Sequence, residues 1–339
     1  MKKIHRTLWS LALWIPVLSA CACSTESAIQ RILGGSSEAP VFLACKAVSA
    51  TEITFQFSQP VHVSALFFDP PLEVASVNEG AVVEVSLKNP PDGGERVTAD
   101  ILVEDQEGNT LNVLVPFRTR NDNLPALCIT EIRADYSKPK VEFVEFRTLE
   151  AGNLGALRIF TALGSLDVPL FEFPPVNVQA GEYIVLHLRN LYEGIDETGD
   201  DLAANPYTKE NEALTDARDF WVPGTQKHLR KTDAVFLMDQ DDAIVDALIF
   251  SENPDAWWKD EKLIRAAELL GRQKAWISPG ESVPSPADAA SSHNVTATRT
   301  LCRDEAVPDT NSPADWYITA SSCASPGKAN NTRRYTPKE

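Results

Sequence analysis

The sequence predicts an all-β protein with two β-sandwich domains in tandem, the second carrying a helical insertion. Apolar and polar residues alternate in short runs, such as residues 53–57 and 82–87, which is the pattern of half-buried strands. Prolines and glycines separate these runs at a spacing of about ten residues. Residues 254–275 instead place apolar side chains at helical spacing. A length of 339 residues fits about two domains.

The first twenty residues have the layout of a secretory signal peptide. Basic side chains among residues 2–6 precede an apolar run at 8–18 and two small residues at 19–20. The apolar run is shorter than the ~20 residues that a membrane-spanning helix needs. We therefore expect an exported protein in which residues 1–20 are removed, leaving 319 residues (339 − 20).

Cys21 directly follows these small residues. The sequence Leu-Ser-Ala-Cys at 18–21 resembles a bacterial lipobox, in which the cysteine becomes the new N-terminus and carries lipid on sulfur and amine. The resemblance implies a palmitate-bearing lipoprotein held at a cell-envelope membrane. Several acyl chains on one cysteine would anchor the protein firmly, whereas a single chain anchors only marginally. The alternative is an ordinary signal peptide cut nearby, with Cys21 and Cys23 incidental.

The strong negative charge bears on the choice of partners. The formal net charge is −17, and loss of three basic residues with the signal peptide makes it −20. A polyanion of this kind repels nucleic acid and anionic headgroups. We therefore expect no nucleic-acid partner, and membrane attachment only through lipid on Cys21.

The first domain is expected at residues 41–122, after a small and polar tether at 21–40. Residues 53–61 and 103–111 resemble the early strand and the late hairpin of bacterial Ig-like modules of surface proteins. The resemblance spans about 80 residues and implies an Ig-like β-sandwich. Residues 121–123, Asn-Asp-Asn, form a short linker to the next domain.

The second domain is expected at residues 127–331. Alternating or continuous apolar runs predict strands at residues 129–132, 141–146, 183–188, 234–238 and 244–250. Several motifs match one family in order: Ile-Thr-Glu-Ile at 129–132, Glu-Phe-Val-Glu-Phe at 142–146, Val-Asp-Ala at 245–247, Arg303, Asp315-Trp316, and Pro-Gly-Lys-Ala-Asn at 326–330. Together they resemble a lamin-tail domain, which implies a second Ig-like sandwich.

The chain departs from the lamin-tail pattern in its first half. Arg147 stands where the family has asparagine, and Asp242-Ala243 replaces the usual glycine of the acidic hairpin. The C-terminal motifs therefore carry the resemblance most firmly.

Two insertions enlarge the second domain. Residues 190–230 are polar and predict a long surface excursion. Residues 254–275 predict a helix that begins at Pro254 and ends near Gly271. At helical spacing the two tryptophans of this segment face different sides, so we assign Trp257 to the core. Trp258 is the candidate contact for a protein or glycan partner.

Four cysteines lie in the expected domains: Cys45, Cys128, Cys302 and Cys323. Disulfides persist in exported proteins, and four cysteines allow three pairings. Cys302 and Cys323 are close in sequence, so we favour that pair, whose loop of about 20 residues would contribute ~3 kcal/mol. Cys45 with Cys128 is the complementary pair. The alternative is that all four are reduced core residues.

Metal binding has weak candidates. Asp239, Asp241 and Asp242 could offer oxygen ligands to calcium, as could the acidic residues at 196–201. Neither set has the full EF-hand spacing, and a solvated turn or loop is the favoured alternative. We expect no other cofactor.

The sequence carries no motif of a known catalytic mechanism. HExxH, GxSxG and CxxC do not occur. His187 lies within an apolar strand, and basic neighbours of His228 should lower the pKa of that imidazole. Glu142 and Glu145 point to opposite faces of one strand, so they are no carboxylate pair. The sequence therefore predicts that this protein is not an enzyme.

These observations favour a lipid-anchored envelope protein that acts as a structural module or displays a binding site for a ligand or partner. A fold analogy carries much of this hypothesis. The alternatives are a calcium-stabilised adhesin and a non-catalytic accessory of an envelope hydrolase or nuclease, because bacterial lamin-tail domains accompany such enzymes.

Overall fold

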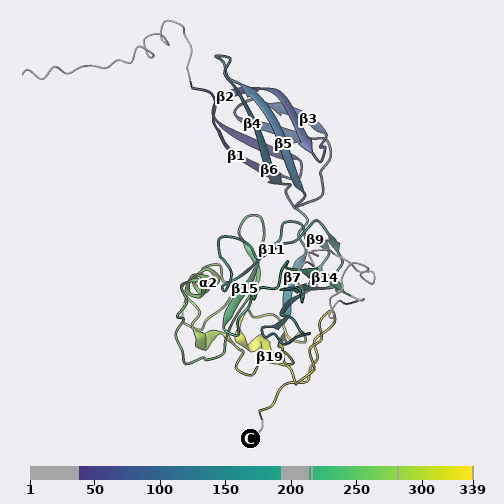
Figure 1. Cartoon of the computed structure of the whole chain (residues 1–339), viewed down its shortest axis with the longest axis vertical. Helices are drawn as coiled ribbons and strands as arrows, with labels where there is room; N and C mark the ends of the chain where they lie inside the picture. The colour runs from purple at the N-terminus through teal and green to yellow at the C-terminus, as the bar shows by residue number, and fades with distance from the viewer. Residues whose placement is uncertain (1–37, 192–213, 215–216, 281, 338–339) are drawn as a thin grey trace, which may run out of the picture.

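The computed structural model describes residues 38–191, 214, 217–280 and 282–337. It confirms the predicted all-β class, because strands in several sheets dominate the described residues and α2 is their one α-helix. Figure 1 shows two bodies in line along the long axis. The expected signal peptide, Cys21 and the acidic residues 196–201 lie outside the described residues.

The first body is a β-sandwich made from six strands. They are β1 (Phe42–Ser49), β2 (Glu52–Asp69), β3 (Val74–Asn78), β4 (Gly80–Leu87), β5 (Arg96–Glu104) and β6 (Thr110–Arg118). The first half of β2 pairs with β1 and β4, and its second half pairs with β5. The pairing with β4 breaks between Gln56 and Val61, around Pro60, which has no N–H to donate. One long strand therefore serves both layers, and Phe55 and Ile101 are fully buried between them.

The second body is a larger sandwich. One sheet has the order β14-β13-β8-β7-β18-β19, and the other has the order β11-β10-β15-β16-β17. The first comprises β7 (Ala126–Arg133), β8 (Phe143–Glu150), β13 (Tyr183–His187), β14 (Arg218–Trp221), β18 (Leu301–Arg303) and β19 (Trp316–Ile318). The second comprises β10 (Arg158–Thr161), β11 (Phe171–Glu172), β15 (Asp233–Met238), β16 (Ile244–Ser251) and β17 (Ala290–Ser291), while β9 (Gly152–Asn153) pairs with β12 (Asn177–Val178). Phe146 and Phe236, from opposite sheets, are both fully buried in the shared core.

The predicted helical insertion is present, but it begins later than expected. Helix α2 spans Glu261–Arg272 and starts where the side chain of Asp260 accepts a hydrogen bond from the backbone N–H of Lys262 at 2.9 Å. A carboxylate at this position satisfies an N–H that the helix leaves unpaired. The helix buries an apolar face that includes Leu263 and Leu270, and it packs on β15 and β16. Residues 254–260 are therefore a loop.

A buried ion pair joins the two sheets of the second sandwich. The Arg303 Nη2 atom on β18 lies 3.0 Å from the Asp246 Oδ2 atom on β16, and both side chains are about 5% exposed or less. Arg303 also donates from Nε to the carbonyl of Ile129 on β7, and its guanidinium lies 5.0 Å from the ring centroid of Trp316. Burial raises the pKa of Asp246 to about 6, and Arg303 limits that rise. The pair fixes three strands and one aromatic ring in a single arrangement.

The junction of the two bodies is a close backbone contact. The side chain of Asn121 donates from Nδ2 to the carbonyls of Asn153 and Gly155, both at 2.8 Å. A Cβ atom placed on Gly155 would lie 1.9 Å from the carbonyl oxygen of Gly93. Only glycine at position 155 permits the two backbone segments to approach this closely.

Replacing Trp316 should destabilise the second sandwich. Trp316 is 9% exposed and belongs to the core, so Trp316→Ala should lower the free energy of unfolding by about 3–5 kcal/mol. Calorimetry of the full chain should show the first sandwich melting as before. Trp257→Ala, at an exposed position, is the matched control and should change stability by less than about 0.5 kcal/mol. A wild-type melting profile for Trp316→Ala would contradict this account of the core.

Gly155→Ala should loosen the junction. The added methyl group must push the backbones of residues 93 and 155 apart, at a cost of about 1–3 kcal/mol. Limited proteolysis should then cut faster at residues 119–123. Gly164→Ala is the control, because its added Cβ would meet the Thr161 side chain at 3.1 Å and the Thr161 carbonyl oxygen at an ordinary 3.5 Å. Equal cleavage rates for the two variants would show that the glycine contact does not hold the bodies together.

Candidate functional site

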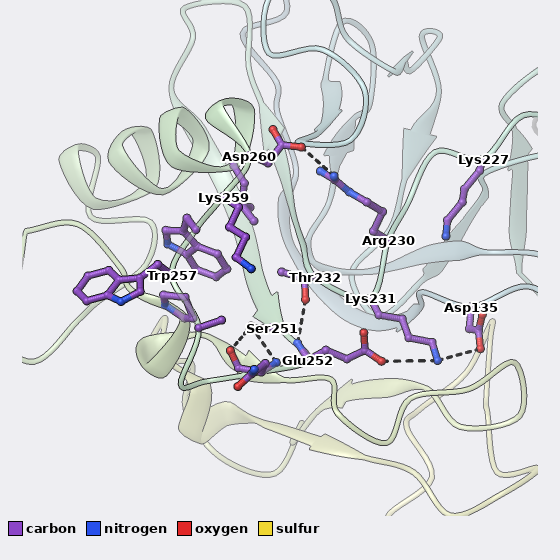
Figure 2. Close-up of a pocket in the computed structure, with 15 residues that line it drawn as sticks. Asp135, Lys227, Arg230, Lys231, Thr232, Ser251, Glu252, Trp257, Lys259 and Asp260 are labelled. Atoms are coloured by element: carbon purple, nitrogen blue, oxygen red, sulfur yellow. Dashed lines mark hydrogen bonds and ion pairs between the residues drawn. The ribbon is translucent and has the colours of Figure 1, made fainter.

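An open pocket of about 500 Å³ lies in the second sandwich. Figure 2 shows its wall, which is made by segment 227–232 before β15, the end of β16, the loop 254–260 and the start of α2. Asp135, which follows β7, completes the rim. The volume falls in the range of small-molecule sites, about 300–1,000 Å³.

Basic side chains gather at this pocket, although the whole chain has a net charge of −17. The Arg230 Nη1 atom lies 2.8 Å from the Asp260 Oδ2 atom, and Lys231 lies 3.3 Å from Asp135. Lys227 and Lys259 line the same pocket, are exposed, and form no ion pair with any described residue. Three carboxylates, those of Asp135, Glu252 and Asp260, line the pocket with these four cationic side chains, so the lining keeps an excess of one positive charge.

The acidic side chains behind the pocket have shifted pKa values. The hydrogen bond from Arg230 lowers the pKa of the Asp260 carboxyl. Burial raises the pKa of Asp233 to about 6, although the backbone N–H groups of Arg230 and Ala234 donate to that carboxylate. Asp260 thus carries a negative charge that holds both Arg230 and the helix start in place.

The two tryptophans take the opposite roles from those expected. Trp257 is 84% exposed, whereas Trp258 packs against the core and donates from Nε1 to the Pro284 carbonyl at 2.7 Å. The expectation rested on helical spacing, but both residues lie in the loop before Asp260. The candidate contact residue is therefore Trp257, and assigning it to Trp258 was wrong.

The expected disulfides are not present in the structure. Cys45, Cys128, Cys302 and Cys323 are all free. The thiol of Cys128 points to the carbonyl of Arg147 at 3.9 Å, and that of Cys302 lies 3.7 Å from the Thr300 hydroxyl. These two thiols have hydrogen-bonding neighbours in their own sheet, and burial raises the pKa of Cys45 and Cys128 to about 12.

The aspartates proposed for calcium have other partners. Asp241 lies 2.5 Å from Arg120 and 3.7 Å from Lys46 of the first sandwich, while Asp242 lies 2.9 Å from Arg158. Asp239 accepts the backbone N–H groups of residues 241 and 243. No group of three or more His, Cys, Asp or Glu side chains is placed to hold a metal within the described residues. This hairpin instead joins the two sandwiches.

The histidines considered for catalysis are packed. His187 lies 2.8 Å from Asp219 and stacks on Trp221, and the side chains of both His187 and Asp219 are at most 1% exposed. The pKa of His228 is lowered, as expected, but by burial and then by Arg189. The sequence neighbours of His228 are not the cause.

A buried carboxylate pair escaped the sequence analysis. Glu131 on β7 and Glu145 on β8 are register partners, and each accepts a backbone N–H of the C-terminal segment, from Ser325 and Gly327. Burial raises the pKa of both carboxyls, and the charge of Glu131 raises that of Glu145 further. Spacing along a single strand relates Glu145 only to Glu142, which lies three residues before it. Strand pairing, which a single sequence does not state, decides this contact.

Comparison with known proteins places the second sandwich in a family. A family model for TP_1001, described as the protein second domain, matches residues 125–318, more than half of the chain. The chain therefore belongs to the TP_1001 second-domain family. The pocket residues, which run from Asp135 to Pro286, all lie within the matched region.

A relative from Treponema pallidum (strain Nichols), described as an uncharacterized protein, is 28% identical over 207 residues. The match covers 57% of this chain and 51% of the relative. The chain thus spans about half the length of the curated relative it matches.

Within the described ranges, no helix has the length and apolar character needed to cross a bilayer.

Asp233 should make stability depend on pH. Its folded pKa of about 6 exceeds the ordinary value of 3.8, so it favours folding most below pH 3.8 and loses that contribution as pH rises through 6. Relative to wild type, Asp233→Asn should gain up to about 3 kcal/mol between pH 3.5 and 7.5. Denaturant unfolding at the two pH values measures this difference.

The control for this experiment is Asp167→Asn, at an exposed carboxylate that pairs with Arg265. It should leave the difference from wild type nearly constant between the two pH values. A constant difference for Asp233→Asn as well would show that Asp233 is not the group that binds the proton.

Proposed function

We propose that this chain is a lipid-anchored envelope protein that displays a ligand-binding module. The lipobox-like sequence at residues 18–21 carries the first half of the proposal, and the pocket beside Trp257 carries the second. Lipid on Cys21 would hold the chain at a membrane, and the acidic surface would keep the folded part away from anionic headgroups.

The arrangement of the two sandwiches supports a display role. The first sandwich follows the N-terminal segment, and the pocket belongs to the second (Figure 1). Contacts at the junction, including Arg118 with Glu172 at 2.6 Å and Arg120 with Asp241 at 2.5 Å, limit independent movement of the two bodies. A stiff arm of this kind would carry the pocket away from the anchored end.

We further propose that the second sandwich is a lamin-tail domain and the first a bacterial Ig-like domain. The motif residues Asp246, Arg303 and Trp316 meet in one buried cluster, although they are up to 70 positions apart (316 − 246). Asn330, from the last motif, donates to the carbonyls of Thr130 and Arg303. This convergence supports a shared structural role for those motifs.

Binding fits the pocket better than catalysis does. The described residues that line it include no histidine or cysteine. Its carboxylates Asp135 and Glu252 lie within 4 Å of Lys231, and Asp260 pairs with Arg230, so each has a cationic partner that disfavours a role as general base. We therefore propose that the second sandwich binds a ligand and does not catalyse a reaction. Calcium stabilisation is not proposed, because the candidate carboxylates have other partners.

Cys21→Ser should abolish lipidation. The hydroxyl group cannot replace the thiol in the thioether bond, so the variant should remain unprocessed, lose incorporation of labelled palmitate and leave the detergent phase in phase partition. Cys23→Ser is the matched control and should partition like wild type. Unchanged partition and acylation of Cys21→Ser would refute the lipoprotein proposal.

A further inference from the structure

An exposed indole stands beside the pocket. Trp257 is 84% exposed, and Figure 2 shows its ring projecting away from the body of the domain. Leaving a large aromatic ring in water forgoes the favourable free energy that burying its apolar surface would give. The neighbouring Trp258 avoids this cost by packing and by its hydrogen bond to Pro284. The flat face of Trp257 is thus available to stack on another molecule.

Positive charge lies within reach of the same ring. Lys259 belongs to the loop that carries Trp257, and its side chain points towards the middle of the pocket in Figure 2. Lys227 is on the opposite wall, and neither lysine forms an ion pair with any described residue. Arg230 lies between them and has two carboxylate partners, Asp260 at 2.8 Å and Asp233 at 3.7 Å. The two exposed lysines are therefore available to an anion from outside the chain.

Polar groups suited to hydroxyls complete the wall. Glu252, Asn253 and Thr232 are lining residues, and the side chains of Glu252 and Asn253 are exposed. Together they offer carboxylate, amide and hydroxyl groups, so both donors and acceptors are at hand. A ligand with many hydroxyls uses both kinds, whereas a purely anionic group uses donors alone.

We propose that this pocket binds a short acidic saccharide, with one sugar ring stacked on Trp257 and its acidic group held by Lys259 and Lys227. The inference rests on the pocket being the binding site of the proposed function, and it names the ligand class. A volume of about 500 Å³ suits a small ligand better than a folded partner. Arg230 adds positive charge and holds Asp260 in place. The Asp260 side chain caps α2, and this contact fixes the end of the loop 254–260 that carries Trp257.

Direct binding to the full chain, purified in detergent, tests the proposal. The probes are trigalacturonic acid, a heparin-derived tetrasaccharide and glucose 6-phosphate, which carry carboxylate, sulfate and phosphate. Each is titrated while tryptophan fluorescence and calorimetric heat are recorded. At least one should bind with a Kd below about 1 mM. The methyl ester of trigalacturonic acid, which is neutral, should bind at least tenfold more weakly than the acid if the acid is the ligand.

Variants assign the binding to the pocket. Trp257→Ala should weaken binding at least tenfold and remove the fluorescence change, and Lys259→Gln and Lys227→Gln should each weaken it about three- to tenfold. All three positions are exposed, so the variants should melt like wild type. Phe67→Ala and Lys88→Gln, at exposed positions of the first sandwich, are the matched controls and should bind like wild type.

Two results would overturn the proposal. One is the absence of binding by all three acidic saccharides, or binding that the pocket variants do not change. The other is equal or tighter binding of triglutamate with the same dependence on Trp257 and Lys259, which would assign the pocket to acidic peptides. Neither result affects the lipid anchor, which the Cys21→Ser experiment tests separately.

Discussion

The buried ion pair of Arg303 and Asp246 is the interaction on which the second sandwich depends. Two desolvated charges are costly, and removing one partner of such a pair leaves the other uncompensated at about 3–5 kcal/mol. Arg303 also holds the Ile129 carbonyl and lies against Trp316, so both sheets take their relative position from it. Asp246 lies on β16, and the end of that strand forms part of the pocket. The geometry of the pocket therefore depends on a contact in the core.

One hairpin connects the junction of the two sandwiches with the pocket. The turn between β15 and β16 carries Asp241, which pairs with Arg120 and Lys46 of the first sandwich. The other end of the same two strands carries Asp233, which lies 3.7 Å from Arg230 of the pocket, and Ser251, which lines it. Because paired strands are stiff along their length, the hairpin sets the orientation of the pocket relative to the first sandwich.

The proposed binding site would let an acidic chain present a local surface for an anion. Most of the surface repels negative ligands, whereas basic side chains from several segments are brought together by the fold. Asp135 and Asp260 hold Lys231 and Arg230 in place, and in the proposed site Lys227 and Lys259, which form no ion pair with any described residue, would supply the attraction. Screening by salt weakens such attraction, so selectivity also needs the ring of Trp257.

The sequence alone determined the all-β class, the two sandwiches and the existence of a helix, because the period of apolar residues is a local property of the chain. Tertiary structure decided the rest of the site. The start of α2 at Asp260, and not at Pro254, put both tryptophans in a loop, and the hydrogen bond from Trp258 to Pro284 left Trp257 exposed. Strand pairing likewise brought Glu131 to Glu145, and the fold carried Asp241 to Arg120. Contacts between residues far apart in sequence depend on register and packing, which no single stretch of sequence encodes.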